Sequence, residues 1–376
     1  MKSLELFSGC GGLAKGLELA GFEHCAFVEF NKWACESLRA NFNPQLVHET
    51  DVRAFDFASV GKVDLIAGGP PCQPFSLGGL AKAYEDSRDM FPQAIRAIHE
   101  LAPRGFVFEN VKGLLRKSFA DYFDYIILRL TFPEQVLSAG LSWREHLDVL
   151  RKIDFSSYKG LKYDVQYKLV NAVDYGVPQN RERVFIVGLR NDLGLRWHWP
   201  GKVRGRKTVA DAIGGLPDSR LKNDLSDHVF VDGAREYPGH TGSDYYQPSK
   251  TIKAGAHGVP GGENMIRFPD GTLRYMTVHE AKLIQTFPND YRICGAWGEA
   301  MRQIGNAVPV RLAKIMGDRM RLTLAAAGHE RISYKTDASG NLLLFEKREK
   351  RQVRKIKKKQ VMDKGKRKRI KYPRHG

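Results

Sequence analysis

A single cysteine, Cys72, follows two prolines in the segment Gly-Pro-Pro-Cys-Gln-Pro-Phe-Ser, residues 69–76. The apolar run at residues 63–67, just before this segment, is typical of a buried strand. Because two prolines fix φ and exclude a helix, we expect the thiol on a stiff turn at the carboxyl end of that strand. In an α/β sheet this edge is where ligands bind. The pattern therefore indicates a cysteine nucleophile inside a binding site.

Charged side chains that could assist such a nucleophile stand beside two other predicted strands. Glu109 ends the apolar run 105–108, and Arg181 and Arg183 come just before the run 184–187. Each feature alone has a structural explanation, since a lone buried cysteine is usually structural, a Glu-Asn pair is often a cap and an Arg-x-Arg is usually exposed. Their common placement at strand ends favours an acid and guanidinium groups near the thiol.

A glycine-rich turn at residues 8–12 follows the first predicted strand. Gly9 and Gly11 allow the backbone to approach a ligand closely at a helix N-terminus. Glu29 ends the second strand, 18 residues after Gly11, where a carboxylate can accept hydrogen bonds from both hydroxyls of a ribose. A tight turn and a surface glutamate without a ligand would give the same pattern. The turn lacks the full Gly-x-Gly-x-x-Gly pattern, which disfavours a dinucleotide.

Strands and helices alternate over residues 1–113, which predicts an α/β fold. Predicted strands lie near residues 3–7, 25–28, 46–49, 63–67, 105–108 and 184–187. Predicted helices lie near residues 13–19, 33–41, 92–101 and 280–286, and from the end of the 303–309 segment to about 325. Such alternation implies a mostly parallel sheet with helices on both faces.

The five cysteines and the apolar runs limit the class of protein. The cysteines form no Cys-x-x-Cys pair, which argues against a zinc site and a disulfide framework. Free thiols fit a reducing compartment, so we expect a cytoplasmic protein. The N-terminus does not have the pattern of a signal peptide, and no run approaches the roughly 18 apolar residues of a membrane span.

Positive charge is concentrated at the C-terminus. Residues 346–376 contain 16 lysines and arginines against three acidic residues, a local charge of +13 out of +18 for the whole chain. With so few apolar residues this basic tail is expected to be disordered in isolation. It is either a solubilising segment or an arm that lies along phosphates, and counterion release on DNA favours the arm.

The order of these motifs resembles the cytosine-5 DNA methyltransferase family. The resemblance rests on Leu-Phe-Ser-Gly-Cys-Gly-Gly, Gly-Pro-Pro-Cys-Gln-Pro-Phe-Ser, Phe-Glu-Asn-Val and Gln-Asn-Arg-Glu-Arg, at residues 6–12, 69–76, 108–111 and 179–183. It covers about residues 3–113, 162–190 and 249–325. The resemblance implies a Rossmann-like, adenosylmethionine-dependent methyltransferase with a mostly parallel sheet and a smaller, irregular target-recognition domain.

This resemblance divides the chain into parts. A catalytic and cofactor-binding domain is expected over residues 1–190, with an insertion at about 114–161 rich in helical, aromatic and charged residues. The glycine- and proline-rich residues 191–273 are expected to form the target-recognition domain, and residues 274–330 the return of the catalytic domain. The insertion is interpreted as a structural elaboration with no assigned function.

The resemblance also implies a reaction. Cys72 would add to carbon 6 of cytosine, so that carbon 5 can take the methyl group of S-adenosyl-L-methionine. Glu109 would protonate ring nitrogen N3. Arg183 would bind the O2 of the base and steady Cys72, while Arg181 would support Glu109. No metal is required by this chemistry.

Cofactor contacts follow from the same resemblance. Phe7 packs on the cofactor, and Glu29 holds its ribose. Asp51 contacts the adenine amino group, Pro71 lies beside the sulfonium, and Asn306 closes the pocket.

The expected partner is double-stranded DNA, from which the target cytosine must be flipped. Residues 76–88 resemble the mobile active-site loop of the family, in which Ser76 and Arg88 would contact DNA. Thr251 resembles a threonine that meets the backbone of the target strand. Within and after the recognition stretch, Arg267, Arg274 and Lys253 are candidates for base or phosphate contacts, without further assignment.

Several alternatives stay open at the level of the sequence. The compact layout resembles a bacterial or phage modification enzyme that acts as a monomer, without a membrane partner. A cognate restriction endonuclease would then act on the same site without forming a complex. A tRNA methyltransferase is disfavoured because its branch carries a Cys-Phe-Thr tripeptide, and none of the five cysteines here precedes Phe. An inactive DNA-binding protein is disfavoured by the intact motifs, whereas an orphan regulatory methyltransferase is not excluded.

Overall fold

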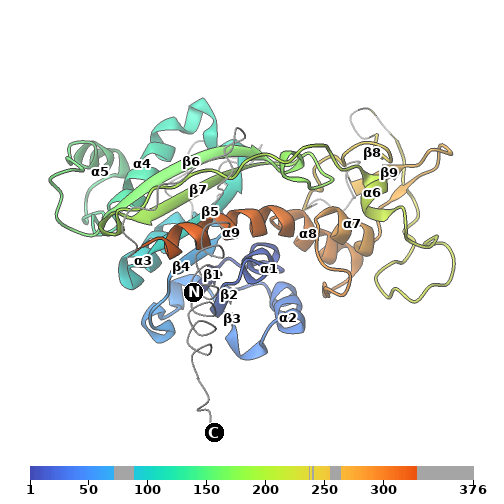
Figure 1. Cartoon of the computed structure of the whole chain (residues 1–376), viewed down its shortest axis with the longest axis horizontal. Helices are drawn as coiled ribbons and strands as arrows, with labels where there is room; N and C mark the ends of the chain where they lie inside the picture. The colour runs from blue at the N-terminus through green and yellow to red at the C-terminus, as the bar shows by residue number, and fades with distance from the viewer. Residues whose placement is uncertain (72–88, 237, 239–240, 255–263, 328–376) are drawn as a thin grey trace, which may run out of the picture. The chain divides into compact units, whose positions relative to one another are not determined.

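The computed structural model describes residues 1–71, 89–236, 238, 241–254 and 264–327. Its main feature is a seven-stranded sheet in the order β3-β2-β1-β4-β5-β7-β6 (Figure 1). The strands are β1 Lys2–Leu6, β2 Glu23–Glu29, β3 Val47–Glu49, β4 Leu65–Gly68, β5 Gly105–Val111, β6 Tyr163–Asn171 and β7 Glu182–Arg190. All neighbours from β3 to β5 pair in parallel, and β7 runs antiparallel to both β5 and β6. The expected mostly parallel α/β sheet is therefore confirmed.

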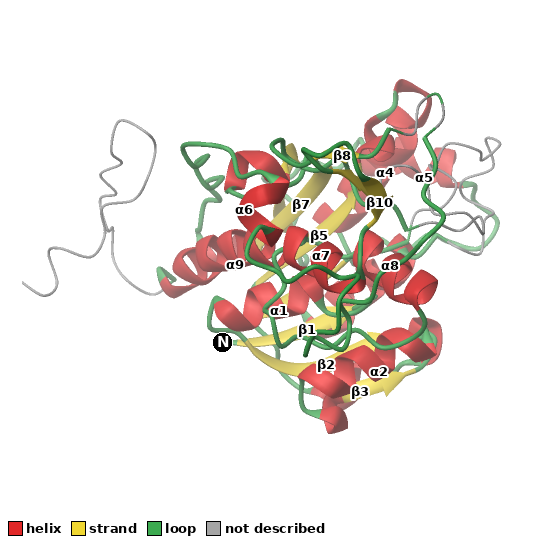
Figure 2. Ribbon diagram, turned by 90° about the vertical axis from the view of Figure 1, so that its right-hand side faces the viewer, coloured by secondary structure: helices red, strands yellow, loops and turns green. Residues whose placement is uncertain are grey.

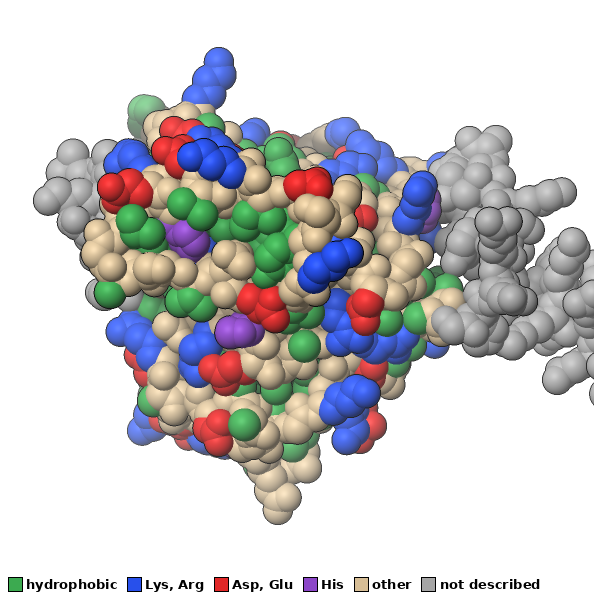
Figure 3. Space-filling model, turned by 90° about the vertical axis from the view of Figure 1, so that its left-hand side faces the viewer, with side chains coloured by type: hydrophobic (Ala, Val, Ile, Leu, Met, Phe, Trp, Pro, Cys, Tyr) green, Lys and Arg blue, Asp and Glu red, His purple; other side chains and the backbone are tan. Residues whose placement is uncertain are grey.

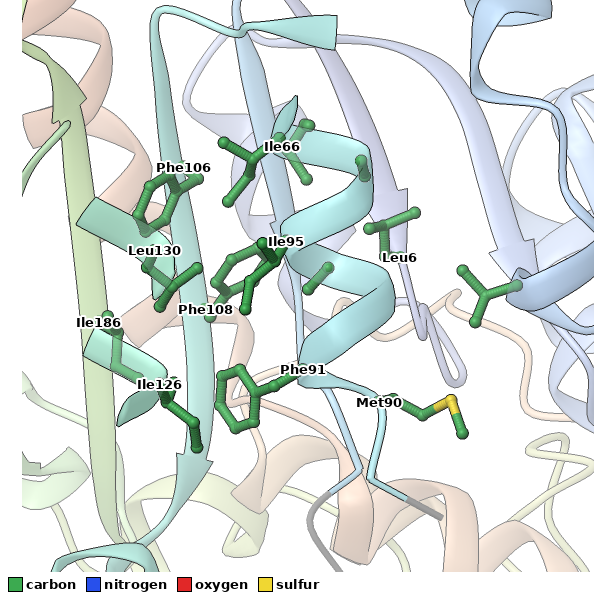
Figure 4. Packing of buried hydrophobic residues seen from close by; sticks show 14 of the residues in the cluster. Leu6, Ile66, Met90, Phe91, Ile95, Phe106, Phe108, Ile126, Leu130 and Ile186 are labelled. Atoms are coloured by element: carbon green, nitrogen blue, oxygen red, sulfur yellow. The ribbon is translucent and has the colours of Figure 1, made fainter. Parts of the chain in front are cut away.

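Alternate side chains on the strands build a separate core on each face of the sheet. Leu6, Ile66, Phe106, Phe108 and Ile186 point to one face, where α3 and α4 cover them (Figure 4). These helices span Phe91–Leu101 and Ala120–Thr131.

The next residues along the same strands face the opposite way. Leu65, Ala67, Val107, Phe185 and Val187 pack against α1 Gly12–Leu19 and α9 Val310–Ala325. The two helices touch at Gly16, where a Cβ would lie 2.3 Å from the Cβ of Ala313, so only glycine permits this approach.

Two strand predictions need correction. Strand β6, at the end of the sheet, was not predicted, although it alternates apolar with polar residues and is mostly half-exposed, a pattern typical of a strand with one covered face. Strand β7 begins at Glu182, so Arg183 lies within the strand and does not precede it. The remaining predicted strands and helices agree with the structure to within a few residues at each end.

The inserted residues and the recognition stretch are built from short elements. Residues 114–161 contain α4 and α5 Trp143–Leu150, as their helical pattern predicted. Residues 191–273 contain α6 Val209–Ile213 and most of a three-stranded sheet, formed by β8 Ser243–Asp244, β9 Met265–Arg267 and β10 Leu273–Tyr275.

The helices that follow the recognition stretch share its core (Figure 2). Val209, Ile252 and Ile266 pack with residues of α7 Val278–Ile284 and α8 Trp297–Asn306 in one hydrophobic cluster. Met1–Gly328 form one compact unit, and the division into a catalytic and a recognition domain stays a prediction. Among the described helices, none is both long and apolar enough to cross a bilayer.

Candidate active site

The carboxyl ends of β4 and β5 bring the turn before Cys72 next to Glu109. Asn110 donates its side-chain amide to the carbonyl oxygen of Pro70 at 2.9 Å, and Met90 donates its backbone N–H to that of Pro71 at 3.2 Å. These bonds hold the turn from both sides. Cys72, Ser76 and Arg88 lie outside the described residues, as does the basic tail.

Glu109 and Arg183 form a nearly buried ion pair on adjacent antiparallel strands. Nε of Arg183 lies 2.8 Å from Oε1 of Glu109, and the two side chains are 14% and 9% exposed. The N–H groups of Arg183 are not aimed at that oxygen, which accepts no hydrogen bond from the described residues. Glu109 also faces the turn, since a Cβ on Gly69 would lie 3.7 Å from its Oε2. An acid beside a guanidinium, with an oxygen still able to bond, suits contact with a polar ring.

Arg181 has a different environment from the one expected. Its fully buried guanidinium donates to the carbonyl oxygens of Ile252, Gly305 and Ala307 at 3.2, 2.7 and 2.9 Å. Burial, together with the charge of Arg183, lowers the pKa of Arg181 well below its usual value. The ion-pair partner of Glu109 is Arg183, and the charges of Arg181 and Glu109 also interact, so the support of Glu109 by Arg181 stays a prediction. The hydrogen bonds of Arg181 connect three segments of chain, namely its own, that of Ile252 and residues 305–307.

Thr251 lies in one of those segments. Residues 249–252 run beside residues 178–180, where Asn180 donates its N–H to Ser249 at 2.8 Å and Ser249 donates to Pro178 at 2.9 Å. The hydroxyl of Thr251 donates to the carbonyl oxygen of Asn180 at 2.6 Å. This pairing brings Thr251 to the segment that leads into Arg181 and Arg183, and its contact with DNA stays a prediction.

A cavity of about 300 Å³ lies at the carboxyl ends of β1 and β2. Four of the predicted cofactor residues line it, namely Phe7, Glu29, Asp51 and Pro71. Phe7 has a φ of 53°, a left-handed conformation that costs a phenylalanine roughly 1–3 kcal/mol. Such strain at a cavity wall is typical of a site whose shape matters for binding.

Glu29 is held by three backbone donors. Its Oε2 accepts the N–H of Gly9 at 2.8 Å, and its Oε1 accepts those of Phe30 and Asn31 at 3.0 and 2.9 Å. A carboxylate has about four lone-pair positions, so capacity remains for a hydroxyl group. Gly9 does not line the cavity itself, and its role is therefore to direct the Glu29 side chain into it.

Gly11 belongs to the packed side of the same turn. It has a φ of 87°, and a Cβ there would lie 2.5 Å from the hydroxyl of Tyr291. The next residue, Gly12, packs on the carbonyl oxygen of Val308, so the segment 306–308 lies close behind the turn. Asn306 is exposed at the end of α8 and is not among the residues that line the cavity. Its closure of the pocket stays a prediction.

Phe30 and Met90 were not predicted as cofactor residues from the sequence. Both line the cavity, and the side chain of Phe30 is 75% exposed. An exposed aromatic face in a cavity wall, next to the Glu29 carboxylate, can stack on a flat heterocycle. An aromatic residue directly after Glu29 was a signal that could have identified Phe30.

One candidate for DNA contact is also corrected. Arg274 forms two bonds to the buried carboxylate of Glu280, at 2.7 and 2.5 Å, and stacks on Phe268. Its side chain is only 12% exposed, so it serves as a structural partner of Glu280 and is not available to contact a DNA base. Arg267 is 37% exposed and pairs with Glu236 at 2.5 Å.

Comparison with known proteins agrees with this geometry. The family model described as C-5 cytosine-specific DNA methylase matches residues 1–132, 140–247 and 235–321. Type II methyltransferase M.PspPI of Psychrobacter sp. (strain TA137) is 34% identical over 359 residues, covering 86% of this chain and 80% of that protein. Type II methyltransferase M.NgoMIV of Neisseria gonorrhoeae is 34% identical over 333 residues, covering 84% and 95%.

Solved structures show the same fold. A prophage-encoded protein of Escherichia coli matches 86% of this chain and 99% of its own with a TM-score of 0.61 at 24% identity. The Entamoeba histolytica methyltransferase EhMeth matches 85% and 97% with a TM-score of 0.60 at 14% identity. With the family model and the relatives above, the conclusion is that this chain is a methyltransferase of the C-5 cytosine-specific DNA methylase family.

Proposed function

We propose that the chain methylates carbon 5 of a flipped cytosine in a specific duplex sequence, through a covalent adduct with Cys72. The observation that carries the proposal is the Glu109–Arg183 pair facing the Gly69–Pro71 turn. This arrangement puts an acid and a cation at the point where the chain continues to Cys72. The cavity beside it contains Phe7, Glu29 and Asp51, a set that fits the aromatic, ribose and amino groups of S-adenosyl-L-methionine.

The chemistry divides among the residues of this chain. The thiolate of Cys72 forms a bond to carbon 6 while Glu109 gives a proton to N3, which makes carbon 5 nucleophilic. Arg183 stabilises the negative charge that develops on O2. When bound, S-adenosyl-L-methionine supplies an electrophilic methyl group on a sulfonium. Once carbon 5 carries the methyl group, transfer of its proton to water lets the Cys72 thiolate leave, and N3 returns its proton to Glu109.

Glu29, Phe7 and Asp51 would bind the cofactor in this scheme. Glu29 would accept the ribose hydroxyls, while Phe7 and Phe30 would enclose the adenine ring. Asp51 would offer its carboxylate to the exocyclic amino group of the adenine. Its Oδ1 accepts the N–H of Arg53 at 2.9 Å, and this bond fixes the orientation of the side chain. Pro71 and Met90 would close the side of the cavity nearest the cysteine turn.

Residues 191–273 would select the target sequence, and Thr251 would hold the backbone of the target strand. The relatives that match most of this chain are named Type II methyltransferases. We therefore propose a modification enzyme whose cognate endonuclease, where one exists, acts on the same site. The basic tail, residues 346–376, would add sequence-independent contacts to phosphates.

Methylation of cellular DNA tests this proposal. DNA from cells that express the chain should carry 5-methylcytosine at one short sequence after methylation-sensitive sequencing, and DNA from cells with Cys72→Ala should not. The same cells supply tRNA for a parallel measurement. If the tRNA is methylated and the DNA is not, the substrate is tRNA and the proposal of a DNA substrate is wrong.

A further inference from the structure

Asp89 joins the start of α3 to the inserted helix α4. Its side chain is buried, with its residue 8% exposed, and its Oδ1 accepts the N–H of Phe91 at 3.1 Å. Its Oδ2 accepts the hydroxyl of Tyr122. A buried carboxylate is tolerated only where hydrogen bonds or charges compensate for lost water. These two bonds therefore fix the first turn of α3 against α4.

The neighbour of Asp89 belongs to the active site. Met90 lines the cofactor cavity and donates its N–H to the carbonyl oxygen of Pro71 at 3.2 Å. Pro71 lines the same cavity and ends the turn that Asn110 holds at Pro70. A shift of Asp89 would therefore move one wall of the cavity and one support of the turn.

The second inserted helix, α5, restrains Tyr122. The ring of Trp143 lies perpendicular to that of Tyr122, with centroids 5.2 Å apart. Arg151, at the end of α5, pairs with Asp121 and Asp124 of α4 at 3.2 and 2.8 Å. Tyr122 itself is only 4% exposed, so its ring cannot turn without displacing its neighbours.

We infer that α4 and α5 support the active site from outside it and that Tyr122 is a positioning residue for methyl transfer. The Tyr122 hydroxyl fixes Asp89, Asp89 fixes the start of α3, and Met90 then sets the cavity wall and the Pro71 contact. This inference rests on the proposed function, because it gives Tyr122 a role in that reaction. It also gives the insertion a specific role, which could not be inferred from its sequence.

A role of the insertion in reading DNA is less favoured by its surface. Figure 3 shows the side of the molecule on which α5 lies in Figure 1. Positive and negative side chains are interspersed on this face and form no continuous basic band. Duplex DNA is bound by surfaces with a clear excess of Lys and Arg.

Tyr122→Phe tests the inference, and Tyr125→Phe is its matched control. Tyr125 lies in the same helix and is equally buried, and its hydroxyl bonds to Nδ1 of His146 and accepts from Arg129, both at 3.1 Å and within the insertion. Each variant loses one buried hydroxyl that bonds to a charged group, so both should lose similar stability. Two quantities are measured for each: the affinity for S-adenosyl-L-methionine without DNA, and the single-turnover rate of methyl transfer at saturating cofactor and DNA.

Tyr122→Phe should lower the single-turnover rate about tenfold, because small displacements of reacting groups are costly, and should weaken cofactor binding several-fold. Tyr125→Phe should leave both within about twofold. Asp89→Ala should reproduce the defect, and adding Tyr122→Phe to it should cause no further loss, since the hydroxyl acts through Asp89.

Equal kinetics for the two tyrosine variants would overturn the inference, as would losses from Asp89→Ala and Tyr122→Phe that multiply. A wild-type chain that binds the cofactor but methylates no DNA would instead refute the proposed function. The cofactor affinities of the variants would still decide the structural claim about Met90.

Discussion

The proposed cofactor side of the site, around Glu29, and the proposed base side, around Glu109 and Arg183, are assembled in different ways. On the cofactor side, Glu29 is held by backbone N–H groups of Gly9, Phe30 and Asn31, all within 20 positions along the chain. On the base side, Glu109 is held by Arg183 from another strand, behind which Arg181 joins residues 71 to 126 positions away. The Glu29 carboxylate is thus positioned by local hydrogen bonds, whereas Glu109 and Arg181 depend on contacts between distant segments.

The two arginines give the largest expected contrast. Arg183→Met removes the cation at the base, so methyl transfer should fall about 10²- to 10³-fold with a modest change in Tm. Arg181→Met removes a donor from three buried carbonyl oxygens, of which only that of Ala307 keeps another among the described residues, the amide of Gln285 at 3.3 Å. Each unsatisfied oxygen costs about 1–3 kcal/mol, so this variant should lower the free energy of unfolding much more. Single-turnover rates and thermal unfolding of both variants provide the measurement.

Equal losses of stability in the two arginine variants would contradict this division of roles. In that case Arg183 would be as structural as Arg181, and the base side would lack an assigned cation.

Glu109→Gln should slow methyl transfer by roughly 10²-fold. Glutamine keeps the shape of the side chain and its place between Gly69 and Arg183, but it cannot transfer a proton to N3. Cofactor affinity, measured by titration without DNA, should stay the same. A parallel loss of cofactor affinity would show that Glu109 shapes the cavity and that its acid role is unsupported.

Glu29→Gln should act on binding and not on chemistry. The amide places an NH₂ group against backbone N–H donors and loses charge-assisted bonds, so cofactor affinity should fall about 10- to 100-fold. At saturating cofactor the single-turnover rate should recover to nearly the wild-type value. A rate that stays low at saturating cofactor would show that Glu29 acts in the methyl-transfer step and not only in cofactor binding.

The cofactor residues were predicted in two ways. Glu29 was identified from its place at the end of a predicted strand, whereas Phe7, Asp51 and Pro71 followed from the family resemblance, and all four line the cavity. The partners of Arg181 could not be predicted, because they are carbonyl groups, which every residue carries and no sequence pattern marks. Strand β6 has no continuous apolar run of the kind that identified the buried strands, but its alternation of apolar and polar residues was a signal that could have identified it.

Gly11→Ala should have the smallest effect, on stability. A Cβ at this position meets the Tyr291 hydroxyl at 2.5 Å in addition to the left-handed φ of 87°. Gly194→Ala is the matched control, because Gly194 has a φ of 62° with nothing within 4 Å of a Cβ. Strain alone should cost about 1 kcal/mol, and Gly11→Ala should exceed that in thermal unfolding. Equal losses would mean that Tyr291 moves aside freely.

Covalent trapping tests the central claim most directly. Duplex DNA with 5-fluorocytosine at the target should form a denaturant-resistant complex with the enzyme when S-adenosyl-L-methionine is present, because fluorine cannot leave carbon 5 as a cation. Cys72→Ala should bind this DNA but form no such complex. A wild-type chain that methylates ordinary DNA without being trapped, or a trapped Cys72→Ala variant, would contradict the proposed cysteine adduct.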